Sequence, residues 1–203
     1  MTRMSDARRI VGALLLVVFA TLAAPVAMAS ETPEAMVNRL GGNAITILAD
    51  KSKTPAERQT GLETLFRDGF DVPLLGQIVL GRYWRSASEQ QKNEYLDVFY
   101  TFVVKTYASR LDSYAGQTFT VLGSSALNDK ETLVNSVVEQ PRGPALKVDW
   151  RVLTRDGEPR IVDVIIEGVS MAITHRSEFA AVIAQNGGNV DALISRLRAQ
   201  ITG

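Results

Sequence analysis

The sequence has 203 residues, of which 46% are apolar and 22% are charged, values typical of a globular chain rather than a disordered or fibrous one. Its 22 basic residues balance 22 acidic ones, so it lacks the basic excess that drives nonspecific binding to nucleic acids. Cysteine is absent and histidine occurs once, which excludes disulfides, cysteine-zinc sites, thiol catalysis and metal sites built from several histidines.

The first 29 residues predict a secretory signal peptide. Three arginines lie within residues 1–9, a weakly polar to apolar run covers 10–22, and Ala27-Met28-Ala29 is a small-x-small cleavage site. Pro25 ends the run early, whereas a membrane-spanning helix needs about 20 apolar residues. We therefore expect cleavage after Ala29 and no stable membrane insertion of the mature chain, 30–203, which would form a single domain. The mature chain has 19 basic and 21 acidic residues, a net charge of −2.

Four helices are predicted before residue 116. Threonine followed by proline begins the first two, at about 33–50 and 55–69, and Asp71 caps a third over 72–80. Ser86-Ala87-Ser88-Glu89 predicts a capping box at the start of the longest helix. The apolar stripe of that helix keeps helical spacing and comprises Leu96, Phe99, Val103, Tyr107, Leu111 and Tyr114.

After Gly116 the apolar period changes from helical to alternating, which predicts strands at 117–122, 132–139, 145–153 and 160–166. We expect a three-residue loop, Asp156-Gly157-Glu158, between the last two strands. That loop would create three apolar cross-strand pairs: Val152 with Val162, Trp150 with Val164 and Val148 with Ile166. On the opposite, solvated face it would create two charged pairs: Arg151 with Asp163 and Lys147 with Glu167.

Two more helices are predicted after Ser170, the first ending at Asn186 and the second short and terminal. Helices grouped before and after an antiparallel meander predict an α+β fold, in which the helices pack on the apolar face of a curved sheet of about four strands.

No catalytic constellation is apparent in the sequence. His175 lies on a predicted amphipathic helix, where we expect a surface or capping role. Ser170 fails the nucleophile-elbow pattern because Ala172 stands where a glycine is needed. Asp149 and Asp163 could act as a carboxylate pair in glycoside hydrolysis, but the predicted register places both on the solvated face. We expect no enzyme activity, no cofactor and no metal.

Aromatic residues are unevenly distributed, since eleven of the fourteen lie between Phe66 and Phe119. A plain aromatic core would explain them. An apolar cavity between the longest helix and the concave sheet would explain them equally well. Such a cavity could hold acyl chains without any charged ligand group, because each buried CH₂ contributes about 0.8 kcal/mol.

Several segments occur together and in order along the mature chain: Phe70-Asp71, Leu80-Gly81-Arg82-Tyr83-Trp84-Arg85, Gly116-Gln117-Thr118-Phe119 and Asp163-Val164-Ile165-Ile166-Glu167-Gly168-Val169-Ser170. In this combination they resemble the MlaC family, also called the toluene-tolerance family, of periplasmic phospholipid-binding proteins.

The resemblance implies an NTF2-like cone that encloses the acyl tails in an apolar pocket and leaves the head group in water. It also implies a periplasmic carrier that moves phospholipid between the outer and inner membranes and so maintains outer-membrane lipid asymmetry. The implied partners are an inner-membrane ATP-binding-cassette (ABC) transporter complex and an outer-membrane lipoprotein bound to a porin. No catalytic residue and no cofactor come with the family.

We expect the pocket wall to combine helical and strand residues. The helical set, which we name the helical wall, is Ile78, Tyr83, Trp84, Phe99, Phe102, Val103 and Tyr107. The strand set, the sheet wall, is Val148, Trp150, Val152, Val164 and Ile166. Arg82 and Arg85 could lie near the mouth and meet a phosphate, although exposed arginines are usually only solvated.

Three alternatives stay open at this point. A hopanoid or another lipid could be the cargo in place of a phospholipid. An NTF2-like enzyme would need an acid-base constellation inside the cavity, and an adaptor without ligand would act through its surface. The sequence leaves open the head group, the number of acyl chains, the direction of transport and the oligomeric state.

Overall fold

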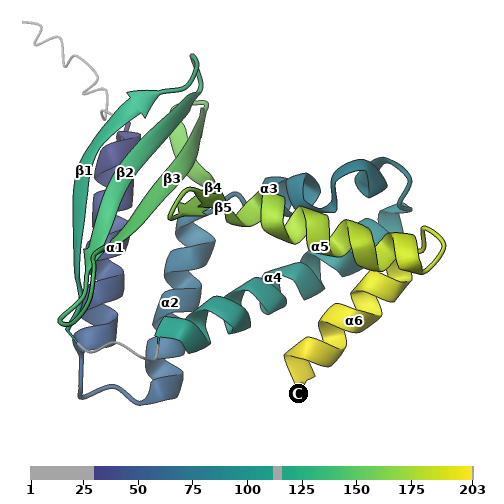
Figure 1. Cartoon of the computed structure of the whole chain (residues 1–203), viewed down its shortest axis with the longest axis horizontal. Coiled ribbons are helices and arrows are strands. Elements are labelled where there is room, and N and C mark those ends of the chain that lie inside the picture. Colours follow the sequence, from purple (N-terminus) through teal and green to yellow (C-terminus); the bar gives the residue numbers. More distant parts are fainter. Residues whose placement is uncertain (1–29, 112–115, 203) are drawn as a thin grey trace, which may run out of the picture.

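A computed structural model describes residues 30–111 and 116–202 (Figure 1). The elements in this part of the chain are α1 (Pro33–Ala49), α2 (Pro55–Gly69), α3 (Val72–Leu80), the 3-10 helix η1 (Gly81–Arg85), α4 (Glu89–Leu111), β1 (Thr118–Ala126), β2 (Glu131–Glu139), β3 (Leu146–Arg155), β4 (Glu158–Ile166), β5 (Val169–Ser170), α5 (Met171–Gln185) and α6 (Val190–Thr202). The predicted α+β class is confirmed. The predicted signal peptide and the stripe residues Leu111 and Tyr114 fall outside the described residues or side chains.

The helix starts follow local capping chemistry. The hydroxyl of Thr32 accepts the backbone N–H of Ala35 at 3.1 Å, and Asp71 accepts that of Leu74 at 3.0 Å. Thr54 and Glu57 form a complete capping box at the start of α2. These three predicted starts are confirmed, because a cap needs only residues within one turn.

The predicted capping box of the longest helix is wrong by two residues. Ser88 forms the box with Gln91: each residue's side-chain oxygen accepts the other's backbone N–H, at 3.0 and 3.2 Å. Ser86 instead donates its hydroxyl to the carbonyl oxygen of Tyr83 at 3.1 Å. The reason is that η1 extends the chain through Arg85, so α4 begins only at Glu89.

The five strands form one antiparallel meander in the order β1-β2-β3-β4-β5. The four predicted strands are present, and the two residues of β5 add a short edge. The residue after α2 also contacts the sheet, because Phe70 forms an isolated β-bridge with Ile161 in β4.

The predicted loop between β3 and β4 is also wrong. Arg155 pairs with Glu158, so the turn contains two residues, Asp156 and Gly157, both with positive φ (53° and 82°). This geometry is typical of a tight hairpin turn. A register shift between the partners of Arg151 and Val152 then inserts an extra residue in β4.

The bulge restores the apolar pairing that the shorter turn would have disrupted. Trp150 lies opposite Val164 and Val148 lies opposite Ile166, as predicted. Val152, however, pairs with Ile161 and not with Val162. The bulge therefore leaves Val148, Trp150 and Val152 opposite apolar residues of β4.

Helix α1 covers the apolar face of the sheet (Figure 1). Met36, Val37 and Leu40 pack against three buried sheet residues, Val134, Val152 and Ile161. We name this set, with the half-buried residues around it, the sheet cluster. The longest helix, α4, packs instead against α2, α3 and α6.

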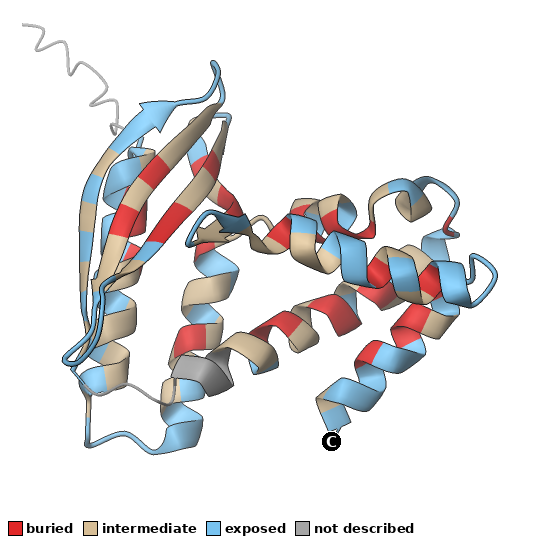
Figure 2. Ribbon diagram, in the orientation of Figure 1, coloured by how far each residue is buried: buried red, intermediate tan, exposed pale blue. Residues whose placement is uncertain are grey.

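Helices α3 to α6 enclose a second apolar core beside the sheet, which we name the helical cluster (Figure 2). Tyr95, Phe99 and Phe179 form its aromatic centre, with Tyr95 and Phe99 stacked at 5.5 Å and Phe179 meeting both edge-on. Phe70 packs against both clusters. The two cores therefore meet at the end of α2.

Candidate functional site

The structure places the whole helical wall in the helical cluster. Phe99 and Val103 are buried on α4. The other five pack against the cluster while partly exposed: Ile78, Tyr83, Trp84, Phe102 and Tyr107. Their elements, α3, η1 and α4, follow one another in the chain, so local connectivity gathers them.

Three of the five sheet-wall residues lie in the other core. Val152 is fully buried in the sheet cluster, with Trp150 and Val164 packed against it. Val148 is buried, and Ile166 is half-buried at the end of β4. The structure therefore places the helical wall and the centre of the sheet wall in two neighbouring clusters rather than in one.

Burial is incomplete on the side of the sheet cluster where α1 and β4 end. Along α1 it falls from Met36 and Leu40, which are buried, to Ile47, which is half-buried. Along β4 it falls in the same way from Ile161 to Ile166. The apolar side chains at this margin still expose surface to water. An apolar ligand that covered them would remove that surface from water and so be bound favourably.

The orientation of Trp150 depends on two residues outside the predicted pocket wall. The hydroxyl of Ser136 accepts the indole N–H at 2.9 Å and donates to the carbonyl oxygen of Val148 at 2.6 Å. The ring of Phe119 meets the indole edge-on at 6.2 Å. A serine in an alternating strand carries no signal of this role, since its partner lies on the next strand.

His175 is more enclosed than its predicted surface or capping role implied, because its side chain is only 15% exposed. Its Nε2 lies 2.9 Å from the hydroxyl of Tyr107, and its Nδ1 lies 3.1 Å from the carboxylate of Glu178. Phe102 and Phe179 flank the imidazole ring at 5.7 and 5.8 Å. Both ring nitrogens are thus engaged, and the histidine joins α4 to α5.

The two aspartates of β3 and β4 are buried, so the expectation that they are solvated is wrong. Asp149 accepts the side-chain amide of Asn135 at 2.8 Å. Asp163 accepts the hydroxyl of Ser170 and, at 3.0 Å, the backbone N–H of Ala172. Asp163 therefore holds the start of α5 against the sheet, which is a structural task and not an acid-base one.

The charged cross-strand pairs also differ from the prediction. Arg151 lies opposite Asp163 in the register, but its guanidinium binds Glu131 on β2 at 2.8 Å. Hydrogen bonds from Arg151 lower the pKa of Glu131 below its ordinary value. Lys147 donates its backbone N–H to the carboxylate of Glu167, while its ammonium lies 3.9 Å from Asp149. A register predicts which Cα atoms are opposite, whereas long side chains can reach to the next strand.

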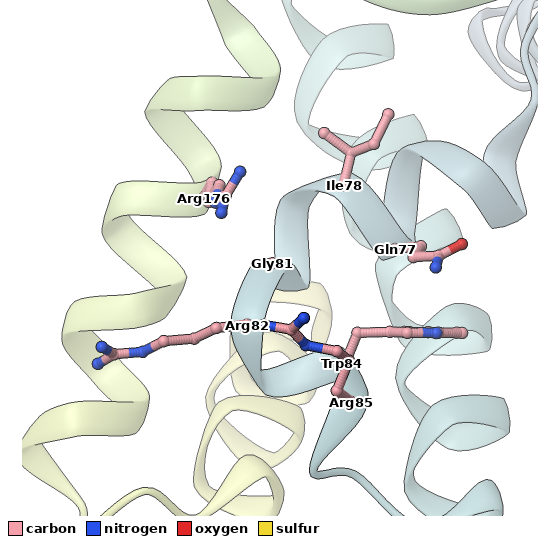
Figure 3. Close-up of a pocket in the computed structure, with 7 residues that line it drawn as sticks. All are labelled: Gln77, Ile78, Gly81, Arg82, Trp84, Arg85 and Arg176. Carbon is pink, nitrogen blue, oxygen red and sulfur yellow. The ribbon is translucent and has the colours of Figure 1, made fainter.

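A cavity of about 320 Å³ lies between α5 and η1 (Figure 3). Its lining combines three cations with two apolar side chains, an amide and a glycine: Arg82, Arg85, Arg176, Ile78, Trp84, Gln77 and Gly81. Ile78 and Trp84 belong to the helical wall. The sequence suggested Arg82 and Arg85 for a phosphate, but Arg176 joins them only through the fold.

Gly81 lets Arg176 approach. Its backbone has φ 59° and ψ −127°, a conformation that residues with a side chain rarely adopt. A Cβ at this position would also lie 2.7 Å from Nε of Arg176. The turn after α3 therefore depends on glycine both for its conformation and for the space that the guanidinium occupies.

A second cavity, of about 410 Å³, lies between α4, α5 and α6. Its apolar lining is Phe102, Phe179, Ala181, Val182, Leu193 and Leu197, and its polar lining is Glu178, Gln185, Arg196 and Gln200. Phe102 is the one member of the helical wall that reaches it. Sequence reasoning missed this space because α6 meets α4 only in the folded chain.

No cluster of three histidine, aspartate or glutamate side chains within residues 30–111 and 116–202 could hold a metal ion. No helix among them is long and apolar enough to cross a bilayer.

Comparison with known proteins gives a consistent family. The family model described as "MlaC protein" matches residues 39–199. The chain is 24% identical over 194 residues to the intermembrane phospholipid transport system binding protein MlaC of Haemophilus influenzae, covering 91% of this chain and 89% of that one. It is 26% identical over 117 residues to the toluene tolerance protein ttg2D of Pseudomonas putida, covering 58% of this chain and 54% of that one.

The fold is similar to a solved structure as well. A phospholipid-binding protein from Ralstonia solanacearum, solved in complex with a phospholipid, superimposes with a TM-score of 0.74 and 25% sequence identity. The superposition covers 84% of this chain and 99% of that one.

Proposed function

Since the chain belongs to the MlaC family, we propose that it is a periplasmic phospholipid carrier, which keeps acyl tails buried while lipid crosses the aqueous space between the outer and inner membranes. The observation that carries the proposal is the similarity in fold, over most of both chains, to a protein whose structure holds a phospholipid. The relative from Haemophilus influenzae is named for intermembrane phospholipid transport, which supports the same role.

The two apolar clusters supply the physical basis. We infer that the tails enter between the helical wall and the sheet wall, along the margin where Trp150, Val164 and Ile166 remain half-buried. Each CH₂ that leaves water there would contribute about 0.8 kcal/mol, so tails of ordinary length need no charged ligand to be held. The walls would have to move apart to admit two chains, and Phe70, which touches both clusters, lies where they would separate.

The wider assignment follows from the family and is part of the proposal. Residues 1–29 would direct export and be removed, and residues 30–203 would act as one lipid-binding domain. An outer-membrane lipoprotein bound to a porin and an inner-membrane ABC complex would be the partners, and their joint task would be outer-membrane lipid asymmetry. A carrier cannot set a direction alone, so direction must come from relative affinities or from ATP spent by the membrane partner.

No catalytic step is needed for this role. The contacts of His175, Asp149 and Asp163 explain their burial without a substrate. An NTF2-like enzyme remains the alternative from another class, and it would require turnover of a small molecule by the purified protein.

The experiment that tests the proposal is detergent-free purification from a bacterial periplasm, followed by solvent extraction and mass spectrometry of the bound lipids. Phospholipid in a fixed ratio to protein is the expected result, and its composition would give the head group and the number of tails. Hopanoid from a producing host would instead select the other lipid cargo. A protein that arrives empty and takes no lipid from liposomes would contradict the carrier function and favour an adaptor.

A further inference from the structure

Three arginines line the cavity between α5 and η1 (Figure 3). Arg82, Arg85 and Arg176 are all exposed, and the cavity lining contains no carboxylate. Within the described part of the chain none of the three forms an ion pair, although most other arginines there do. Positive charge is therefore concentrated here and left uncompensated, in a mature chain whose net charge is −2.

Two of the three arginines, Arg82 and Arg176, have defined neighbours. The guanidinium of Arg82 lies 4.8 Å from the ring centre of Tyr83 and donates to the hydroxyl of that tyrosine at 2.8 Å. Arg176 lies against Gly81, which has no side chain to push it away. Guanidinium groups that are already oriented lose less entropy when they bind phosphate oxygens, and each can do so with two N–H donors.

Exposed apolar side chains lie on and just before the helix that carries Arg176. Ile173 is 65% exposed and precedes Arg176 by three residues, so the two occupy the same face of α5. Val169, at the start of β5, is 53% exposed. Exposed aliphatic residues beside arginines are typical of surfaces that lie in the head-group region of a membrane.

We propose that this surface, the docking patch formed by Arg82, Arg85, Arg176, Val169 and Ile173, binds the surface of a bilayer that contains anionic phospholipids. The arginines bind lipid phosphates, and the two aliphatic side chains enter the boundary between head groups and acyl chains. In a bilayer, lipid phosphates and the ends of the acyl chains lie within a few ångströms of each other in depth. This arrangement matches the exposed arginine and isoleucine on one face of α5. The inference rests on the proposed function only in that a lipid carrier has to meet membranes.

Flotation of the periplasmically processed protein with vesicles tests the patch. One vesicle set contains phosphatidylglycerol in phosphatidylcholine, and the other contains phosphatidylcholine alone. The variant R82Q/R85Q/R176Q is compared with K51Q/K130Q/R142Q, which removes the same charge from exposed positions on loops outside the patch. We expect the patch variant to lose about 100-fold in partitioning onto anionic vesicles, and the control variant to change far less.

The apolar part of the patch has its own pair of variants. V169S/I173S should lose about tenfold in partitioning, whereas L122S, at a leucine that is 62% exposed on β1, should bind as the wild type does. The variant R82K/R85K/R176K keeps the charge and should retain most of the binding, which guards against loss caused by misfolding. Higher salt should weaken the binding of the wild type.

Three results would overturn the proposal, the third being wild-type protein that does not bind vesicles. Equal losses in both glutamine variants would mean that net charge alone governs binding. Undiminished binding by the patch variant would mean that the arginines do not bind the bilayer, and would favour an acidic protein partner for them. Bound lipid is measured on the same preparations, so the two proposals can fail separately. Wild-type protein that carries lipid but ignores vesicles contradicts only the patch, whereas protein that binds vesicles but carries no lipid contradicts only the carrier function.

Discussion

The ring of Phe119 lies so close to Gly41 that a Cβ atom on the glycine would be 2.2 Å from the ring carbon Cε1. The contact joins the middle of α1 to the first long strand, and Phe119 in turn meets Trp150 edge-on. The missing side chain at position 41 therefore sets how closely α1 approaches the sheet wall.

Gly41→Ala should destabilise the protein by about 1 to 3 kcal/mol, because the added methyl forces α1 and the ring apart. The adjacent Gly42 is a matched control, since a Cβ there would meet nothing within 4 Å. Gly42→Ala should be neutral or stabilise the helix by up to about 1 kcal/mol. Urea unfolding measures both changes, and Phe119→Leu should recover part of the loss in the Gly41→Ala background. Equal stability of the two alanine variants would contradict the contact.

Tyr95→Phe should lower the free energy of unfolding by about 1 kcal/mol at pH 7, because the buried hydroxyl donates to the carbonyl oxygen of Gly76 at 3.1 Å. Burial raises the pKa of Tyr95 well above its ordinary value. The unfolded state then ionises first, so this tyrosine costs stability only as the pH rises past about 10, the value in unfolded chains.

The phenylalanine variant should therefore lose less stability between pH 9 and 11 than the wild type, which chemical denaturation at each pH would show. Tyr100→Phe is the control, because that hydroxyl is partly exposed and binds the side chain of Arg67 at 3.1 Å. An identical alkaline slope for the wild type and Tyr95→Phe would contradict the prediction.

Glu131→Gln should reveal the ion pair between β2 and β3. Hydrogen bonds from Arg151 hold the pKa of Glu131 below its usual range, so the folded state gives up this proton more readily than the unfolded state does. The resulting stabilisation is complete above the unfolded pKa of about 4.3 and is lost as the pH falls through the lower, folded value. The pair is partly exposed, so we expect a difference of about 1 kcal/mol at pH 7.

Thermal unfolding from pH 7 to pH 3 would measure that difference, which should disappear at the acid end. Asp129→Asn, in the adjacent loop, is the control, because this exposed side chain forms no ion pair with the residues that the structure describes. A difference that persists unchanged at pH 3 would mean that packing, and not charge, is what the glutamine disturbs.

Val164→Trp and Val148→Trp should reduce the lipid that copurifies with the protein, by about half or more, because each fills space along the proposed sheet wall. Leu122→Trp adds the same side chain at an exposed position of β1 and should leave the lipid load unchanged. Mass spectrometry of extracts from the three variants makes the comparison, with circular dichroism to check the fold. Wild-type loads in both valine variants would contradict this wall.

The local features of the fold could be read from the sequence. Caps at Thr32, Thr54 and Asp71, and strands marked by alternating polarity, depend on residues within a turn or a few positions of one another. The aromatic segment, too, was expected to build an apolar interior, and Tyr95 and Phe99 do so.

Only the tertiary structure decided how these elements combine. The bulge in β4 corrects the register of Trp150 because the sheet must keep its apolar face under α1, and no short-range signal predicts such a correction. Asp163 binds the start of α5, and Arg176 contacts Gly81. The residues of each contact are separated along the chain, so only tertiary packing brings them together. The spacing of apolar residues predicts which face of each helix or strand is buried. Which other element packs on that face depends on how all the elements pack together.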